Sequence, residues 1–315
     1  MKEFIHESVL LQECLEGLNI RPDGVYVDCT LGGGGHSSRI AERLSEGGRL
    51  IGIDRDEDAL RAAGERLAPW ADRFTPVKSN FSDVKNVLTD LELRADGILF
   101  DLGVSSFQLD EPERGFSYMQ DAPLDMRMDR SGGMTAADLV NTYDEFAIAD
   151  ILWRYGEERY SRQIARAITK ARIEMPIRTT GRLCEVIKSA MPPQALREKQ
   201  HPAKRSFQAL RIAVNGELSA VEEALTDLWK HLNPGGRICV ITFHSLEDRI
   251  TKEIFADMAK GCTCPPQFPV CVCGGKPKVK LISKKPILPT AEELERNPRA
   301  RSAKLRVCEV LEQEE

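Results

Sequence analysis

A short apolar strand that leads directly into four glycines constrains the fold of this chain more than any other feature. The strand is expected at Val25–Cys29, the glycines are Gly32–Gly35, and a helical pattern follows at Ser37–Leu44. Glycines at such a turn let backbone N–H groups approach a ligand closely, and the start of the helix adds a positive dipole. The pattern predicts a cofactor-binding loop on an α/β sheet.

The alternation of strand and helix continues through the first hundred residues. Further apolar runs lie at Arg49–Asp54, Phe74–Lys78 and Gly97–Asp101, and a helical stretch lies at Asp56–Leu67. Strands that alternate with helices indicate βαβ units and a parallel sheet. We therefore expect an α/β fold with a doubly wound, mostly parallel sheet.

From about residue 106 the pattern changes to turns and helices. Thr142 and Glu145 have the spacing of a capping box, which predicts a helix at Phe146–Tyr155. Two more helices are expected near Ser161–Ile173 and Arg182–Met191. The alternation of strand and helix is therefore predicted to stop here, with an irregular stretch at 107–134 followed by helices.

A long amphipathic pattern then leads back to strands. Apolar residues from Phe207 to Leu232 recur at spacings of three and four, which predicts one helix with one buried face, even though Gly216 lies inside it. Strands are expected at Arg237–Phe243 and Leu305–Leu311. The simplest organisation is a cofactor-binding domain at 1–106 and 215–315, interrupted by an inserted helical domain at 107–214 that recognises the substrate.

The glycine loop distinguishes between two classes of cofactor. A dinucleotide fingerprint needs Gly-x-Gly-x-x-Gly, but counting from Gly32 the sixth position is Ser37. Asp28 ends the strand four residues before Gly32. An acid at the end of this first strand is typical of S-adenosylmethionine sites, where it serves the amino-acid end of the ligand. Asp28 and Gly32 are therefore candidate contacts for S-adenosylmethionine.

Three later strands also end in residues that could contact a cofactor. Asp54 ends the second strand, where a carboxylate can accept hydrogen bonds from ribose hydroxyls, and Phe81 follows the third, where a ring could lie against adenine. Each has a simpler interpretation, Asp54 as a surface acid and Phe81 as a core residue. Asp101 ends the fourth strand, and such features at successive strand ends are far more specific than the glycines alone.

Asp101 is also the candidate catalytic residue. Methyl transfer from a sulfonium is an in-line displacement, so that positioning supplies much of the acceleration. An exocyclic base amine is a weak nucleophile because its lone pair is delocalised into the ring. A carboxylate beside the N–H localises that lone pair and stabilises the positive charge that forms. Asp101 could do this, or it could only hold the cofactor.

The distribution of charge points to a polyanionic partner, although the net charge of −5 does not. Residues 159–211 contain 13 basic and 3 acidic residues, a net of +10, and residues 276–306 contain 10 and 3, a net of +7. The rest of the chain therefore carries −22. Segregated basic blocks are typical of surfaces that bind nucleic acid, and the alternative is a solvated, arginine-rich helix face.

A target base must be single-stranded or flipped out to reach a cofactor pocket. The irregular stretch 107–134 could hold it, with Phe116 for stacking and Arg114 and Arg127 for phosphates. Lys204 and Arg205, in the first basic block, are further candidate RNA contacts. Phe116, considered alone, could instead belong to the core.

Several long motifs, spread over nearly the whole chain, are shared with one known family. They are HESVLL (6–11), DCTLGGGGHS (28–37), DLGVSSFQLD (101–110), RGFSYM (114–119), PLDMRMD (123–129), YGEER (155–159), HPAKRSFQALR (201–211), TFHSLEDR (242–249) and NPRARSAKLR (297–306). With these motifs the chain resembles the bacterial 16S rRNA cytosine-N4 methyltransferases, the RsmH or MraW family.

The resemblance implies a class I S-adenosylmethionine-dependent methyltransferase fold with an inserted helical domain. It also implies methyl transfer to N4 of one cytidine in the decoding region of 16S rRNA, the RNA of the small (30S) ribosomal subunit. By the same resemblance the cofactor contacts are Gly34, Gly35, His36, Asp54, Phe81, Asp101 and Gln108. Many amino-methyltransferases have an acid or amide followed by Pro-Pro-aromatic, whereas this chain has Asp101-Leu-Gly-Val, so both roles of Asp101 stay open.

Nine cysteines and no secretory pattern indicate a reducing, cytoplasmic location, and no apolar stretch predicts a membrane span. Cys262, Cys264, Cys271 and Cys273 could bind structural zinc. Zinc sites more often use Cys-x-x-Cys, so we expect a loop of reduced thiols, and methyl transfer itself needs no metal. A homodimer is compatible with the sequence.

Two other functions stay as alternatives. A non-catalytic RNA-binding or ribosome-assembly protein on the same fold would be expected to lose some of the strand-end acids and loop glycines, which are all present. A nicotinamide-dependent oxidoreductase shares the sheet but requires the fingerprint glycine that Ser37 replaces. The sequence therefore favours an S-adenosylmethionine-dependent rRNA methyltransferase.

Overall fold

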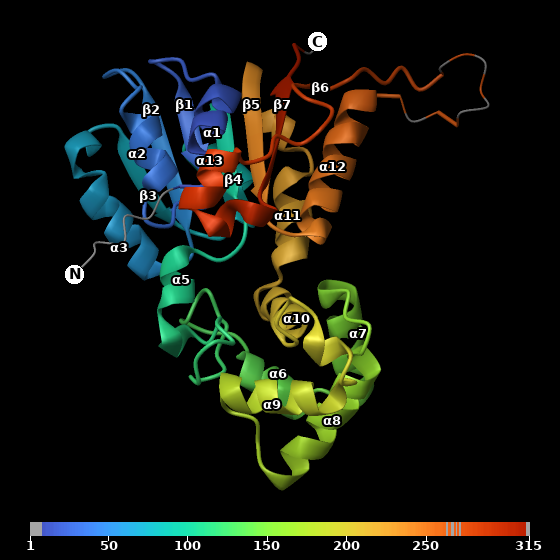
Figure 1. Cartoon of the computed structure of the whole chain (residues 1–315). Helices are drawn as coiled ribbons and strands as arrows, with labels where there is room; N and C mark the ends of the chain where they lie inside the picture. Colours follow the sequence, from blue (N-terminus) through green and yellow to red (C-terminus); the bar gives the residue numbers. More distant parts are fainter. Residues whose placement is uncertain (1–7, 263, 266–267, 269, 271, 313–315) are drawn as a thin grey trace. The chain divides into compact units, whose positions relative to one another are not determined.

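The computed structural model describes residues 8–262, 264–265, 268, 270 and 272–312. The chain divides into two compact units (Figure 1). Unit 1 comprises the residues up to Gly103 and those from Leu218 onward, and unit 2 comprises Val104–Glu217. Unit 1 contains the sheet, and unit 2 is helical.

The strands of unit 1 form one seven-stranded sheet in the order β3-β2-β1-β4-β5-β7-β6. They are β1 (Val25–Asp28), β2 (Arg49–Asp54), β3 (Phe74–Lys78), β4 (Ala95–Asp101), β5 (Leu232–Thr242), β6 (Val279–Leu281) and β7 (Lys304–Val310). β1 to β5 pair in parallel, whereas β7 runs antiparallel to β5 and β6. The α/β class expected from the sequence, with a doubly wound and mostly parallel sheet, is confirmed. The three-residue strand β6 was not expected.

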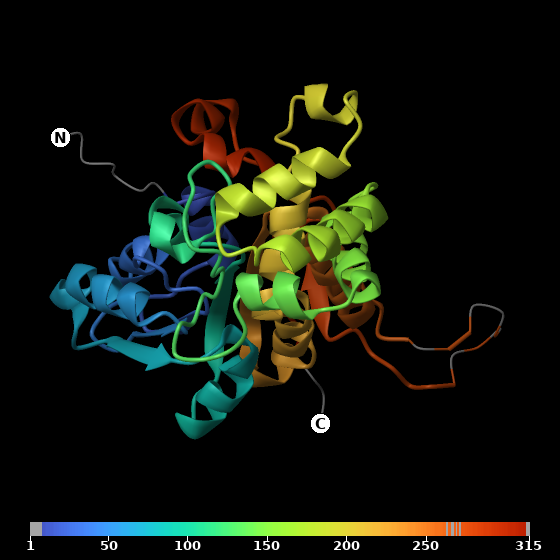
Figure 2. The same cartoon turned by 90° about the horizontal axis from the view of Figure 1, so that it is seen from below.

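Helices cover both faces of this sheet (Figures 1 and 2). They are α1 (Leu11–Leu18), α2 (Gly35–Ala41), α3 (Glu57–Arg66), α4 (Val84–Asp90), α11 (Glu217–Leu225), α12 (Ser245–Lys260) and α13 (Ala291–Arg296). In β4, Ile98 and Phe100 pack into the core shared with α4, α11 and α12, while Leu99 packs into the core shared with α1, α2 and α3. Because both faces are buried, the strand reads as a continuous apolar run in the sequence.

Unit 2 has its own helical core. Its helices are α5 (Ser106–Asp110), α6 (Ala136–Thr142), α7 (Glu145–Gly156), α8 (Ser161–Glu174), α9 (Thr180–Ala190) and α10 (Lys204–Asn215). α8 packs against α7 and α9, and α10 packs against α7 (Figure 2). Ile148, Leu152, Ile164 and Leu210 are fully buried within this core. The core of unit 2 is separate from the two cores that flank the sheet.

Two helix boundaries differ from the sequence-based predictions. The cap of α7 is Asp144, whose carboxylate accepts a hydrogen bond from the Ala147 N–H at 2.7 Å, whereas Thr142 is the last residue of α6. The predicted helix through Phe207–Leu232 is broken at Gly216, which adopts a left-handed conformation with φ of 61° and ends α10. α11 ends at Leu225, the 3-10 helix Leu228–His231 follows, and Leu232 already belongs to β5.

The periodicity continued across Gly216 because both helices have an apolar face, although these faces belong to different cores. Phe207 and Leu210 pack into unit 2, whereas Val221 and Leu225 pack into unit 1. Among the residues that the structure describes, no helix combines the length and the hydropathy that are needed to cross a membrane.

Candidate active site

Three of the strand-end acids lie on neighbouring strands of unit 1. β1 pairs with β2 on one side and with β4 on the other, so that Asp28, Asp54 and Asp101 lie at the same carboxyl edge. The strand order reverses between β1 and β4. Open α/β sheets bind ligands outside the carboxyl ends of the strands at such a switch point. This edge is therefore the candidate active site.

The glycine loop after β1 presents open backbone at this edge. A Cβ atom added at Gly33 would meet nothing within 4 Å, whereas one added at Gly35 would lie 2.1 Å from Ser8 Oγ. Gly32 and Gly34 have φ of 50° and 73°, in the left-handed region where a side chain is strained. The loop thus needs glycine for its turn and for its packing, while Gly33 leaves space that a ligand can fill.

Asp28 is buried at the end of β1 and anchors the loop through hydrogen bonds. Its side chain is 1% exposed, Oδ2 accepts a hydrogen bond from Ser37 Oγ at 2.7 Å, and Oδ1 accepts one from the Thr30 N–H at 3.1 Å. Burial raises the pKa of Asp28, and the hydrogen bonds from Ser37 and Thr30 oppose that rise. Asp28 therefore connects the end of β1 to α2.

Asp54 anchors the loop from the next strand. Its Oδ2 accepts a hydrogen bond from the Gly32 N–H at 2.9 Å, and its Oδ1 accepts one from the Asp56 N–H at 2.9 Å. Burial raises the pKa of Asp54, and the hydrogen bonds from the Asp56 and Gly32 N–H groups oppose that rise. Each carboxylate oxygen keeps a second lone pair, which could accept from a ligand hydroxyl.

Asp101 has an unsatisfied carboxylate oxygen. Its side chain is 27% exposed, yet Oδ1 is buried and has no hydrogen-bond partner among the described residues. Burial raises the pKa of Asp101 to about 6; the positive charge of His36 opposes this, and the nearby carboxylates of Asp28 and Glu247 add to it. A buried acceptor left without a donor is costly, so this oxygen is suited to a donor that the described part of the chain does not provide.

His36 lies between Val9 and Asp101. The ring is 6% exposed, and Nε2 lies 3.0 Å from the carbonyl oxygen of Val9. Because a carbonyl only accepts hydrogen bonds, Nε2 carries a proton. Nδ1 lies 3.7 Å from Oδ2 of Asp101. The sequence alone suggested only a residue at a helix start, and the structure places it beside the candidate catalytic acid.

Phe81 packs edge-on against Phe100 of β4, with ring centroids 6.1 Å apart and an interplanar angle of 85°. It begins the short 3-10 helix Phe81–Asp83, which Asn80 caps by accepting a hydrogen bond from the Ser82 N–H. The ring is partly buried against the core of unit 1. This position contributes to the core and leaves part of the ring exposed.

Two polar residues after β5 were missed by the sequence analysis. Glu247 is 1% exposed, and its Oε1 lies 3.0 Å from Nε2 of His244, which caps α12. Glu247 also accepts a hydrogen bond from the Phe243 N–H at 2.9 Å. Its carboxylate is one of the charges that raise the pKa of Asp101. The signal was present, because a His and a Glu at capping-box spacing directly follow a predicted strand.

The other predicted site residues lie in unit 2. Gln108 is 5% exposed, and its Oε1 accepts a hydrogen bond from the Ser105 N–H at 3.2 Å. Lys204 and Arg205 lie in the first turn of α10, Lys204 exposed and Arg205 half-buried. Two positive charges at a helix N-terminus are unfavourable for the helix dipole. Their position favours a nearby anion over a role in helix stability.

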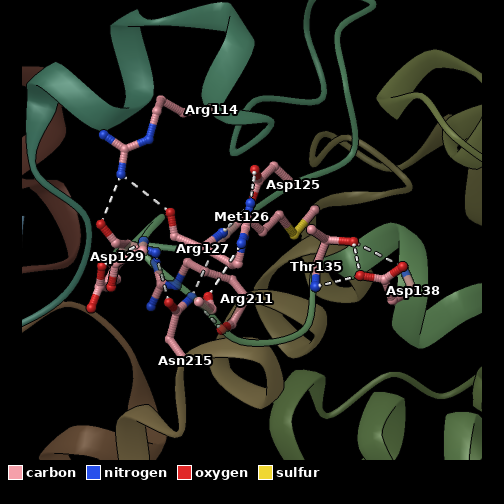
Figure 3. A network of polar contacts seen from close by, with 12 residues as sticks. Arg114, Asp125, Met126, Arg127, Asp129, Thr135, Asp138, Arg211 and Asn215 are labelled. Atoms are coloured by element: carbon pink, nitrogen blue, oxygen red, sulfur yellow. Dashed lines mark hydrogen bonds and ion pairs between the residues drawn. The ribbon is translucent and has the colours of Figure 1, made fainter.

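Arg114 and Phe116 are inside unit 2. Arg114 is 2% exposed and donates hydrogen bonds to the carbonyl oxygens of Arg127 at 3.2 Å and Met128 at 2.9 Å, while Phe116 is 6% exposed (Figure 3). The Arg127 side chain forms an ion pair with Asp125 at 2.8 Å. The guanidinium of Arg114 is therefore used within the protein, and that of Arg127 already has a carboxylate partner.

Asn215 holds the same stretch of the segment 114–130, residues 126–128, through its side-chain amide. Its Oδ1 accepts a hydrogen bond from the Met128 N–H at 2.8 Å, and its Nδ2 donates to the Met126 carbonyl oxygen at 2.8 Å (Figure 3). Met126 is fully buried at a φ of 63°, an unfavourable conformation for a residue with a side chain. Strained backbone that is fixed from two sides is typical of functional segments.

Three of the four clustered cysteines belong to the described residues. The Sγ atoms of Cys262, Cys264 and Cys273 all lie within 4.8 Å of one another. Cys271, the fourth cysteine of the sequence pattern, lies outside the described residues. The cluster lies between α12 and β6.

Known proteins resemble this chain over nearly its whole length. The sequence model of the MraW methylase family matches residues 3–311. A protein of Brevibacillus brevis named ribosomal RNA small subunit methyltransferase H is 62% identical over 98% of both chains. A protein of the same name from Paenibacillus sp. is 59% identical, over 98% of this chain and all of the other. Among solved structures, an rRNA methylase from Streptococcus thermophilus has a TM-score of 0.41 and 11% identity, over 96% of this chain and 93% of the other.

Proposed function

This chain belongs to the MraW methylase family, and on that premise we propose that it transfers a methyl group from S-adenosylmethionine to N4 of a cytidine in the decoding region of 16S rRNA. The names of the relatives support a substrate in the RNA of the small ribosomal subunit. The observation that carries the proposal is the buried Oδ1 of Asp101 at the end of β4, which has no hydrogen-bond partner within the described ranges.

The residues at the carboxyl edge of unit 1 fit S-adenosylmethionine. Gly33 leaves open space beside the loop, and Asp54 has carboxylate lone pairs at the end of β2 for the ribose hydroxyls. Asp28 acts by holding Ser37 and Thr30, and thereby the loop, in place. Phe81, His36, Gln108, Gly34 and Gly35 complete the proposed cofactor contacts. The bound cofactor supplies the electrophilic methyl group.

Asp101 is proposed as the catalytic residue. Its ionised Oδ1 accepts a hydrogen bond from the exocyclic N–H of the cytosine, which localises the nitrogen lone pair for in-line attack. As the C–N bond forms, the carboxylate stabilises the positive charge on nitrogen, and the proton leaves afterwards. This step needs the ionised carboxylate, because a protonated acid would lose much of that stabilisation.

Unit 2 is proposed to bind the RNA. Lys204 and Arg205 would contact phosphates at the N-terminus of α10, where a polyanion would also offset their repulsion with the helix dipole. Arg114 and Phe116 shape the segment 114–130 from inside, while Arg127, which is 21% exposed, lies on its surface. We propose that this segment holds the splayed-out cytidine.

To test the function, the protein is incubated with labelled S-adenosylmethionine and either naked 16S rRNA or 30S particles. The labelled nucleoside is then identified. N4-methylcytidine is expected from the wild type, and label on a ring carbon, a ribose or a protein would contradict the proposal. Asp101→Ala should abolish transfer, whereas Asp90→Asn, at an exposed acid that ends α4, should leave it unchanged. Full activity of Asp101→Ala would remove Asp101 from the mechanism.

A further inference from the structure

The chain between α12 and β6 contains a cluster of cysteines that methyl transfer does not use. The segment leaves α12 at Gly261 and returns at Gly275, where the two backbones nearly touch. A Cβ atom added at Gly275 would lie 2.2 Å from the Gly261 carbonyl oxygen, and one added at Gly261 would lie 2.3 Å from the Lys276 carbonyl carbon. Only glycines permit this approach. Gly261 and Gly275 therefore let the two ends of the segment lie against each other.

Cys262 and Cys273 lie just inside this closed base. Their Sγ atoms are 3.7 Å apart, too far for a disulfide bond, which is about 2.05 Å long. In a tetrahedral zinc site with Zn–S bonds of about 2.3 Å, two thiolate sulfurs lie about 3.8 Å apart. The observed separation therefore corresponds to two ligands of one tetrahedral ion. The Sγ of Cys264 lies within 4.8 Å of both.

Backbone amides are directed at two of the sulfurs. The Val272 N–H donates to Cys264 Sγ at 3.4 Å, and the Gly275 N–H donates to Cys273 Sγ at 3.4 Å. Hydrogen bonds from the backbone stabilise thiolates, and such contacts orient the ligands of metal sites. The two donors come from the returning arm of the segment, which also supplies Cys273.

We propose that Cys262, Cys264 and Cys273 bind one zinc ion, which fixes the segment between α12 and β6. Each thiol loses its proton to solvent as the thiolate binds the metal. The three thiolates take three of the four tetrahedral positions, and water takes the fourth. The role of the ion is structural, since it joins the two arms of a segment that the glycines already bring together. The Cys-x-Cys spacing is unfavourable for two ligands from one pair, but here the ligands come from both arms of the segment.

Metal analysis of the full chain, purified under reducing conditions without chelator, tests this directly. We expect about one zinc per chain in the wild type, and a large loss of zinc in each of Cys262→Ser, Cys264→Ser and Cys273→Ser. Cys184→Ser is the matched control, because Cys184 is a reduced cysteine in α9 of unit 2, and it should keep its zinc. Zinc that persists in all three variants, or a wild type that binds no added zinc, would overturn the proposal.

Zinc could also be lost because a variant fails to fold. Thermal unfolding of the wild type with and without zinc avoids this ambiguity. Removal of zinc with a chelator should lower the thermal unfolding midpoint, and added zinc, but not magnesium, should restore it. Thiol titration of the denatured protein should find all nine cysteines reduced. Two fewer thiols, lost from a peptide that contains Cys262 and Cys273, would show a disulfide in place of the metal and would also overturn the proposal.

Discussion

Nδ1 of His36 lies 3.7 Å from Oδ2 of Asp101, while the other ring nitrogen of His36 is held by the carbonyl of Val9. The imidazole is thus fixed with one nitrogen directed at the candidate catalytic acid. A protonated ring lowers the pKa of Asp101, but burial outweighs it and raises that pKa to about 6. The state of this carboxylate can therefore change within an experimentally accessible pH range.

Methyl transfer should fall on acidification through about pH 6. Because the ionised carboxylate accepts the N–H, activity requires Asp101 above its pKa of about 6. At pH 5 only about a tenth of the groups would be ionised, and the single-turnover rate should be about tenfold lower than at pH 8. His36→Asn removes the charge that lowers this pKa and should move the midpoint upward. A rate that is flat from pH 5 to 8 would argue for a purely cofactor-holding role.

Asp101→Asn should stabilise the fold while it abolishes transfer. The folded-state pKa of about 6 lies above the ordinary pKa of an aspartate, about 3.9. Ionised Asp101 therefore disfavours folding, and this cost is fully present above pH 6 and absent below the unfolded-state pKa. Removing the charge should raise the free energy of unfolding by at most about 3 kcal/mol at pH 8.

Thermal unfolding at two pH values checks this effect. The difference between Asp101→Asn and the wild type should be larger at pH 8 than at pH 5, because the folded wild type is mostly protonated at pH 5. The exposed-acid variant Asp90→Asn should show no such difference. A destabilised Asp101→Asn protein at pH 8 would show that the carboxylate has a donor within the protein.

Much of the site was predictable because its signals are local. A strand that ends in an acid and continues into glycines is visible within a dozen residues, as at Asp28. The hydrogen-bond partners of the site residues could not be predicted, because these contacts join residues distant in sequence, such as Val9 and His36. Arg114 was predicted to contact phosphate, and nothing in the local sequence indicates that it donates to the carbonyls of Arg127 and Met128 instead. The helix break at Gly216 was hidden by a periodicity that two cores happen to share.

Gly33→Ala should weaken binding of S-adenosylmethionine without harming the fold. A Cβ at Gly33 meets no protein atom within 4 Å, so it projects into the space proposed for the cofactor. We expect at least about a tenfold loss of affinity, or 1.4 kcal/mol, by calorimetry. Gly64→Ala, where a Cβ also meets nothing within 4 Å and lies in helix α3, is the control and should bind normally. Unchanged binding by Gly33→Ala would place the cofactor elsewhere.

Gly35→Ala should act in the opposite way, through stability. Its Cβ would lie 2.1 Å from Ser8 Oγ, so the Ser8 side chain must move. Overpacking of this kind typically costs about 1–3 kcal/mol, which a denaturant titration can measure. The double variant Gly35→Ala with Ser8→Gly removes the clashing hydroxyl and should recover most of the loss. Failure of this rescue would mean that the strain has another origin.

Lys204→Ala and Arg205→Ala should weaken RNA binding without affecting binding of S-adenosylmethionine. If each side chain neutralises one phosphate, each substitution should reduce the slope of log affinity against log salt by about one. Arg61→Ala, at an exposed arginine of α3 in unit 1, is the control and should leave the slope unchanged. Filter binding to a 16S rRNA fragment between low and moderate salt measures all three variants. The slope is the criterion because a change in affinity alone could arise from altered helix stability. Equal slopes in the wild type and in the double variant Lys204→Ala/Arg205→Ala would exclude the N-terminus of α10 from the RNA contact.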